Sequence, residues 1–186
     1  MGKKLFEMSL EELWQLFPII LTAHQDCWKE WYFEEEILLK KVLPQAQRIS
    51  HIGSTAISSI WAKPIVDILV EIPKESNLFF YKDLIARNGY ICMSESEKAL
   101  SFNKGYTENG FAERVFHLHL RYTGDNNELY FRDYLNEFPD IAKEYEKLKL
   151  SLWKEYERNR DAYTNAKTAF VKKYTEQAKM IYDNRY

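Results

Sequence analysis

The sequence predicts an α+β domain in which a small mixed β-sheet in the middle of the chain is flanked by helices on both sides. Three observations lead to this class. Apolar residues recur with helical spacing near the N-terminus, over residues 9–43. Over residues 46–121 the pattern changes to the short, β-branched runs of strands. From residue 126 to residue 183 the helical spacing returns.

The size and composition of the chain are those of one folded domain, which we expect to span residues 1–186. The chain is 46% hydrophobic and 16% aromatic, so it can bury a sizeable core. Its 26 basic and 28 acidic residues nearly cancel, and this balance gives no sign of a nucleic-acid or membrane partner. Cys27 and Cys92 form no C-x-x-C pair, and no signal-peptide core opens the chain. We therefore expect a cytoplasmic protein with reduced thiols and leave its oligomeric state open.

The elements follow in order along the chain. Ser9 and Glu12 form a capping box for a first helix that stops at Pro18, and apolar spacing over residues 25–42 predicts a second. A short strand over 46–52 precedes a turn rich in small and hydroxyl residues. A helix capped by Ser76 ends at Gly89. The remaining strands are predicted at 64–72, 90–94, 99–106 and 113–121, and the C-terminal helices at 128–138, 140–156 (capped by Asp140) and 161–182.

Two of the predicted strands carry polar side chains on one face only. Side chains alternate between the two faces of a strand. In the strand 64–72, Asp67 and Glu71 therefore lie on one face with Leu69 between them, and the plain core residues Val66, Ile68, Val70 and Ile72 lie on the other. In the strand 113–121, His117 and His119 share a face, about 7 Å apart. If the two strands are neighbours, Asp67 and both histidines converge in a catalytic or metal-binding group.

Each of these residues also has a plain structural explanation. Asp67 alone fits an edge position or an ion pair, Glu71 fits an exposed strand end, and a pair of histidines fits a solvated strand face. His51, beside a turn, fits a hydrogen bond to its own loop. The coincidence of two polar faces on otherwise apolar strands favours a site, because burying uncompensated charge is costly.

The turn Gly53-Ser54-Thr55 directly follows a predicted strand. Such a turn lets backbone N–H groups approach an anion closely, and its hydroxyls can donate to a phosphate. Lys63 stands just before the strand that carries Asp67 and can reach the same side as a point charge. The turn and Lys63 together predict a phosphate site near Asp67.

Several blocks of the sequence together resemble the GrpB family. These blocks are "HIGSTAISSIWAKPIVDILVEI", "FHLHLR", "FRDYLNEFPDIAKEYEKLK" and "DAYTNAKTAFV", in this order, and the resemblance covers roughly residues 25 to 180. It implies a nucleotidyltransferase-like fold, with a mixed sheet, flanking helices and a helical C-terminal half. The occurrence of a GrpB-like domain fused to dephospho-CoA kinase connects the family with nucleotide or coenzyme A metabolism.

The sequence departs from the active pattern of that superfamily, which has Asp-x-Asp or Asp-x-Glu on the strand, a third carboxylate nearby and two metals. Here Leu69 replaces the second acid, and His117 or His119 stands where the third is expected. A set of Asp67, His117, His119 and His51 would suit Zn²⁺, Mn²⁺ or Fe²⁺ better than Mg²⁺, which prefers carboxylate and water oxygens. A divalent metal ion, Mg²⁺, Mn²⁺ or Zn²⁺, is therefore the cofactor to expect.

We therefore expect binding of a nucleotide or another phosphate-bearing small molecule in a metal-assisted cleft. The further step would be divergent nucleotidyl transfer, with Asp67, His117 and His119 as catalytic residues. The expected phosphate ligands are Gly53, Ser54, Thr55 and Lys63, with Arg121, Arg132 and, from the family block, Lys167. Tyr163 and Lys167 are expected in the cleft wall. Two alternatives stay open: a non-catalytic nucleotide- or coenzyme A-binding regulator, which Leu69 favours, and a metal-dependent phosphohydrolase.

Overall fold

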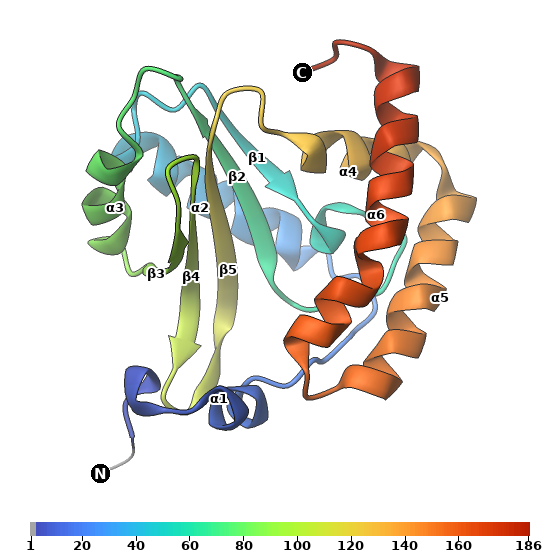
Figure 1. Cartoon of the computed structure of the whole chain (residues 1–186), viewed down its shortest axis with the longest axis horizontal. Helices are drawn as coiled ribbons and strands as arrows, with labels where there is room; N and C mark the ends of the chain where they lie inside the picture. The colour runs from blue at the N-terminus through green and yellow to red at the C-terminus, as the bar shows by residue number, and fades with distance from the viewer. Residues whose placement is uncertain (1–2) are drawn as a thin grey trace.

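The structure is a computed structural model that describes residues 3–186, so the first two residues of the predicted domain lie outside it. It confirms the α+β class (Figure 1). The helical elements are η1 (Leu5–Glu7), α1 (Leu10–Leu16), α2 (Cys27–Val42), η2 (Ser54–Ala56), α3 (Leu78–Ala86), α4 (Asn127–Glu137), α5 (Pro139–Tyr156) and α6 (Arg160–Tyr182). The strands are β1 (Arg48–Ile52), β2 (Val66–Ile72), β3 (Ile91–Glu95), β4 (Ala99–Thr107) and β5 (Gly110–Tyr122).

The five strands form one mixed sheet in the order β1-β2-β5-β4-β3. The two central strands, β2 and β5, run parallel, and every other pair is antiparallel. In the central pair Asp67 lies opposite His117, and Leu69 lies opposite His119. The two strands that the sequence singled out are therefore direct neighbours, with their polar positions in register.

The two faces of the sheet differ as the alternation of β2 and β5 predicts. One face packs under α2 and α3, where Val66, Ile68 and Val70 join a core with residues such as Trp28 and Leu39. The opposite face carries Asp67, His117 and His119. Helices α4, α5 and α6 pack together beyond the β1 edge of the sheet, at the right of Figure 1. Helix α1 lies across the lower end of β4 and β5 (Figure 1).

The helix ends confirm one predicted cap and correct two others. The capping box at α1 is present: Ser9 Oγ accepts from the Glu12 N–H at 3.2 Å, and Glu12 Oε2 accepts from the Ser9 N–H at 2.8 Å. The cap of α3 is Asn77, whose Oδ1 accepts from Phe79 N, rather than Ser76. Asp140 does not cap α5, because Pro139 already occupies the first helical position, where its missing N–H is no loss.

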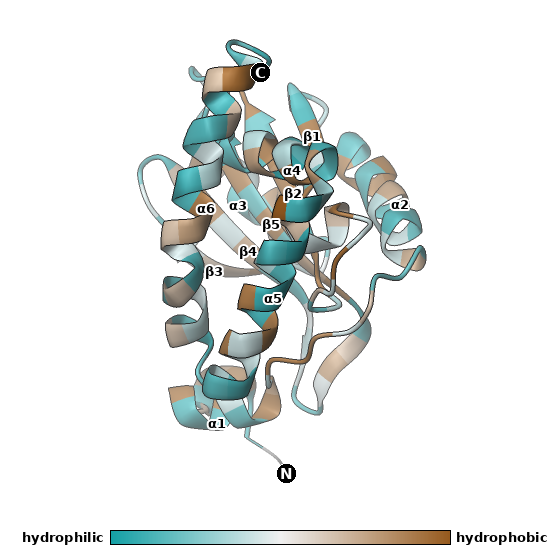
Figure 2. Cartoon of the chain, turned by 90° about the vertical axis from the view of Figure 1, so that its right-hand side faces the viewer, coloured by the Kyte–Doolittle hydropathy of each residue, from teal (hydrophilic) through white to brown (hydrophobic). Residues whose placement is uncertain are grey.

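The C-terminal helices are amphipathic and pack on one another. Their buried side chains, including Tyr134, Tyr145 and Tyr174, form a second cluster with Ile57 and Ile60 from the segment after η2. Figure 2 shows α5 and α6 with alternating hydrophilic and hydrophobic residues along their length. Within residues 3–186, no helix combines the length and the apolarity needed to cross a membrane.

Candidate functional site

The turn after β1 rests directly on the carboxyl group of Asp67. Ile52, the last residue of β1, pairs with Asp67, and Gly53 follows with φ +71° and ψ −172°, a combination that L side chains rarely adopt. A Cβ atom at this position would lie 2.3 Å from Asp67 Oδ2. Glycine is therefore required here both by the backbone and by space, and it places the Ser54–Ala56 turn beside the carboxylate.

Asp67, His117 and His119 meet on the polar face of the sheet. Asp67 Oδ1 lies 3.1 Å from His117 Nδ1 and 3.7 Å from His119 Nε2. The side chain of Asp67 retains 27% of its exposure, so the carboxylate opens onto a hollow rather than into the core. The structure thus brings together the three residues that strand alternation predicted to converge.

A chain of hydrogen bonds extends this group to two further residues. Tyr106 Oη lies 2.8 Å from His117 Nε2, and Arg160 Nη2 donates to Tyr106 Oη at 2.9 Å. An ionised Asp67 can only accept, so His117 Nδ1 donates to it. Nε2 of the neutral ring then accepts the proton of the Tyr106 hydroxyl, whose oxygen accepts from Arg160. Each donor in this order meets an acceptor, which fixes the Nδ1–H tautomer of His117.

The pKa shifts of Asp67 and His117 agree with these donor and acceptor assignments. Burial acts to raise the pKa of Asp67, but its hydrogen bonds to His117 and His119 outweigh burial and hold that pKa far below its ordinary range. Burial lowers the pKa of His117 despite the neighbouring carboxylate, and the charges of Lys63 and Arg160 lower it further. Near neutral pH the site therefore holds a carboxylate and a neutral imidazole.

Tyr106 reaches this face through an irregularity in β4. Asn103 pairs with His117 and Lys104 with Phe116, so strict alternation would turn Tyr106 to the same side as Lys104, toward α2. The register shifts between Lys104 and Tyr106, and Gly105 adopts φ +88° there. A Cβ atom on Gly105 would lie 2.2 Å from the carbonyl oxygen of Arg114. This bulge re-aims the tyrosine toward His117.

Asp67, Tyr106, His117 and Arg160 line a cavity of about 860 Å³, whereas His119 is not part of its lining. The cavity lies between the polar face of the sheet, the N-terminal segment and helices α5 and α6. Its lining includes Gly53, Ser54, Thr55, Lys63, Asp67, Asn103, Tyr106, His117, Tyr145, Lys149, Arg160, Asp161, Tyr163 and Lys167. The volume falls within the range of small-molecule sites.

Four basic side chains line the cavity. Burial, together with repulsion from neighbouring cations, lowers the pKa of Lys63 and Lys149 to about 7 and that of Lys167 to about 8. Lys63 and Lys167 also lie on the ring of Tyr163, with Nζ 5.3 Å and 4.3 Å from its centroid. Arg160 is the fourth cation. Asp67 and the exposed Asp161 are the carboxylates of the lining, so positive charge exceeds negative charge when the lysines are protonated.

Three residues that the sequence predicted as site residues lie elsewhere. His51 pairs with Ile68 and so points to the opposite face, where it stacks on Tyr32 at 4.8 Å. Arg132 donates to the backbone carbonyl of residue 51 and to Tyr186, and Arg121 donates to the carbonyls of residues 100 and 120.

Glu71 is not the exposed strand end that its position suggested. It is buried, forms an ion pair with Arg48 at 3.2 Å, and accepts from Gly124 N and Asn126 Nδ2 at 3.0 Å each. The hydroxyl of Thr55 has a structural role too, because it donates to the carbonyl of Ile65.

Three residues of the cavity were missed by the sequence reasoning. Arg160 precedes Tyr163 and Lys167 by three and seven positions, so helical spacing alone places all three on one face of α6. Lys149 occupies the apolar stripe of α5 between Tyr145 and Leu152, and a charge on such a stripe is itself a signal. Tyr106 carried no such signal, because its orientation depends on the bulge.

The donor set does not fit a divalent metal ion. Both ring nitrogens of His117 are engaged, one by Asp67 and the other by Tyr106, so neither offers a free lone pair. Lys63 and Lys167 face the same space and would repel a dication. Across residues 3–186, no three His, Cys, Asp or Glu side chains are grouped so as to hold a metal ion.

The sheet and its Gly53 turn define a nucleotidyltransferase-like fold, and comparisons with known structures agree. The Cid1 poly(U) polymerase with MgGTP bound superposes with a TM-score of 0.52 at 10% identity, over 78% of this chain and 46% of that chain. At this identity the likeness shows the shared fold alone.

The chain belongs to the GrpB family: the family model described as "GrpB protein" matches residues 18–177. The glutamate-rich protein GrpB of Alkalihalophilus pseudofirmus is 36% identical over 160 residues, covering 82% of this chain and 91% of that protein. The UPF0157 protein YqkA of Bacillus subtilis is 32% identical over 92% of this chain, which spans 50% of its length. The crystal structure of conserved protein GrpB from Enterococcus faecalis superposes with a TM-score of 0.76 at 32% identity, over 88% of this chain and 99% of that chain.

Proposed function

We propose that the chain binds a phosphate-bearing small molecule in this cavity without the help of a metal ion. One observation carries the proposal: Lys63, Lys149, Arg160 and Lys167 converge on a single hollow that also contains the Gly53 turn. Confining like charges away from water is costly, as the lowered lysine pKa values reflect. A bound phosphate would offset that cost and stabilise the protonated lysines.

Hydrogen-bond donors of the cavity support the same ligand. Ser54 lies in the turn, next to Gly53, and belongs to the lining of the cavity, so its hydroxyl is available as a donor to an anion. The side chain of Tyr163 is fully buried, and its hydroxyl has no hydrogen-bond partner in the part of the chain that the structure describes. Tyr163 belongs to the lining, so a small shift of its ring would let this hydroxyl donate to a ligand oxygen.

The hydrogen-bonded chain from Arg160 to Asp67 favours a second function, phosphoryl or nucleotidyl transfer. In this reaction an acceptor hydroxyl attacks a phosphorus atom of the ligand, a new P–O bond forms, and the bond to the leaving phosphate or pyrophosphate breaks. The hydroxyl proton passes to Tyr106 Oη while Tyr106 gives its own proton to His117 Nε2. Asp67 stabilises the resulting imidazolium, and the lysines and Arg160 neutralise the leaving group.

Isothermal titration calorimetry with ATP, coenzyme A and pyrophosphate, each with EDTA and with Mg²⁺, tests the binding proposal. We expect binding in EDTA that weakens at least about tenfold in Lys167→Met, because a charge-assisted hydrogen bond contributes about 1.5–3 kcal/mol. Lys172→Met is the matched control, since Lys172 lies on the same helix but is exposed and outside the cavity. The proposal fails if none of the three ligands binds, or if the two variants behave alike.

Turnover separates the second function from a binding module. Release of pyrophosphate or phosphate in EDTA, lost in Tyr106→Phe with ligand affinity retained, would support transfer through the hydrogen-bonded chain. Tight binding with no turnover for any acceptor would instead support the non-catalytic regulator. Activity that appears only with a divalent metal would contradict the metal-free mechanism and favour the phosphohydrolase or a two-metal reaction.

A further inference from the structure

Exposed apolar side chains gather around the mouth of the same cavity. Phe6 is 84% exposed and Met93 57% exposed, and both belong to the lining, as do Leu10 and Ile91. Helix α1 and the short helix η1 before it, all within the described part of the chain, bury none of their own residues. Large apolar surface left open to water in one place marks a binding surface rather than a folding core.

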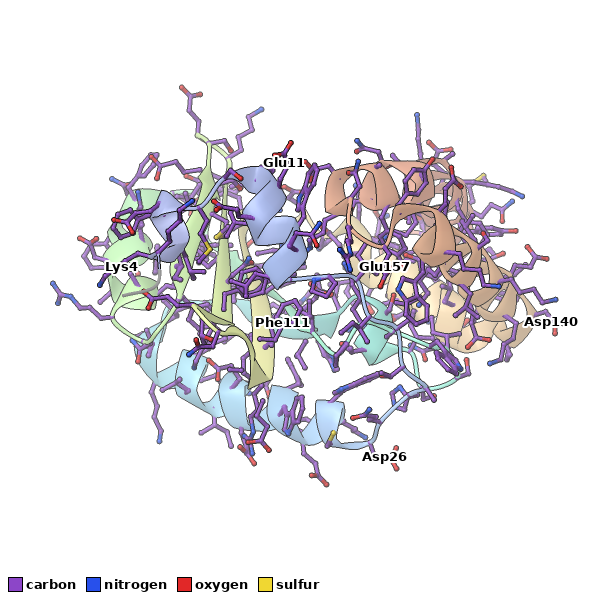
Figure 3. The ribbon with its side chains drawn as sticks, turned by 90° about the horizontal axis from the view of Figure 1, so that it is seen from below. Lys4, Glu11, Asp26, Phe111, Asp140 and Glu157 are labelled. Atoms are coloured by element: carbon purple, nitrogen blue, oxygen red, sulfur yellow. The ribbon has the colours of Figure 1, made fainter. Side chains whose placement is uncertain are left out.

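The N-terminal segment is held against the sheet and against the end of α5. Figure 3 shows α1 beside the start of β5 at Phe111, between the sheet and the helix end at Glu157. Phe17, which follows α1, packs against Phe111 with tilted rings, 5.0 Å between centroids, and the Ile19 N–H donates to the carbonyl of Glu157 at 2.9 Å. These contacts fix the N-terminal segment as one wall of the cavity.

The two parts of the lining differ in chemistry. Residues 5–17 contribute only apolar side chains to it, and residues 91–93 add two apolar residues and a cysteine: Leu5, Phe6, Leu10, Leu13, Trp14, Phe17, Ile91, Cys92 and Met93. None of these carries a charge or an amide that would recognise a polar body. The basic residues of the lining come from other segments: Lys63 from the segment just before β2, and Arg160 and Lys167 from α6. The cavity is therefore amphipathic.

We propose that the ligand is amphiphilic: a phosphate or diphosphate ester of an apolar body, with the phosphate at the basic residues and the body against residues 5–17 and 91–93. This inference rests on the proposed function and names its ligand class. The volume of about 860 Å³ exceeds what a phosphate group alone can fill. Charge complementarity with the basic residues places the phosphate end of the ligand, and the exposed apolar wall places its apolar end.

The test compares probes that share a head group and differ in the body. Calorimetry in EDTA uses methyl phosphate, hexyl phosphate and pyrophosphate. Each fully buried methylene gives about a fourfold gain in affinity, so five extra methylenes give roughly a thousandfold gain if all are buried. We expect hexyl phosphate to bind at least about thirtyfold more tightly than methyl phosphate, with a change in Trp14 fluorescence.

Exposed positions allow variants that leave the fold intact. Leu10→Ser and Met93→Ser should each lower the affinity for hexyl phosphate at least about threefold and leave the affinity for pyrophosphate unchanged. Phe80→Ser is the control, because Phe80 is 66% exposed on α3 and does not line the cavity.

The outcomes separate this inference from the proposed function. Equal affinities for the two esters, or equal behaviour of Met93→Ser and Phe80→Ser, would overturn the inference while pyrophosphate binding still supported the phosphate site. Failure of pyrophosphate and both esters to bind would overturn the proposed function itself. A dimer in sedimentation that dissociates in Leu10→Ser would also overturn the inference, because a second copy would then cover the apolar wall.

Discussion

Replacing Gly53 by alanine tests how closely the turn and the carboxylate of Asp67 are fitted together. The backbone at φ +71° and ψ −172° lies in a region that is essentially restricted to glycine, where another residue costs about 1–3 kcal/mol. The new Cβ would also lie 2.3 Å from Asp67 Oδ2, closer than real Cβ contacts. For a chain of this size 1 kcal/mol shifts the melting temperature by roughly 2–4 °C. We therefore expect backbone strain to lower the melting temperature of Gly53→Ala by roughly 2–12 °C. The contact between the new Cβ and Asp67 Oδ2 should lower it further.

Gly124→Ala is the matched control. Gly124 also has a left-handed backbone, at φ +93°, but within the described residues no heavy atom lies within 4 Å of its ideal Cβ. Thermal and urea denaturation of both variants separate strain from contact, and ligand binding of Gly53→Ala reports whether Asp67 has moved. If Gly53→Ala is no less stable than Gly124→Ala, the close fit of turn and carboxylate is wrong.

Three further predictions follow from the charges and hydrogen bonds. The pKa values of Lys63, Lys149 and Lys167 in the folded state lie below the ordinary 10.5, so the unfolded chain binds more protons between about pH 7 and pH 9.5. The free energy of unfolding measured in urea should rise with pH in this window and should rise less in Lys63→Met. A wild-type free energy of unfolding that stays flat or falls with pH would contradict this. Nitrogen NMR at pH 7 should show His117 as the neutral Nδ1–H tautomer, and an Nε2–H signal would break the proposed hydrogen-bond order. Arg132→Gln should lose about 1–2 kcal/mol of stability by leaving a β1 carbonyl unpaired, while phosphate affinity stays within twofold of wild type.

The sequence was informative wherever local periodicity decides structure. Alternation in β2 and β5 assigned Asp67, His117 and His119 to one face correctly, because the period of a strand is fixed. The element types were also predicted, and the helix caps failed only where a neighbour such as Asn77 or Pro139 competed for the same role.

Tertiary packing decided what the sequence did not reveal. His51 was assigned to the site because it is near Gly53 in the chain, yet the antiparallel register turns it to the other face. Arg132 has the charge of a phosphate ligand, but it holds a strand end and the C-terminal segment instead. Lys149 and Lys167 follow Lys63 by 86 and 104 positions, and no local pattern reports a meeting over such separations.

Proton uptake on ligand binding at pH 8 tests most directly whether the buried lysines hold the phosphate. At this pH a phosphate ester is already ionised, whereas Lys63 and Lys149, with pKa values of about 7, are mostly uncharged. Calorimetry of the tightest-binding ester in buffers of different ionisation enthalpy measures the protons exchanged. We expect net uptake that decreases in Lys63→Met and is unchanged in Lys172→Met. Binding without uptake, or uptake unaffected by Lys63→Met, would contradict the proposal that the buried lysines hold the phosphate.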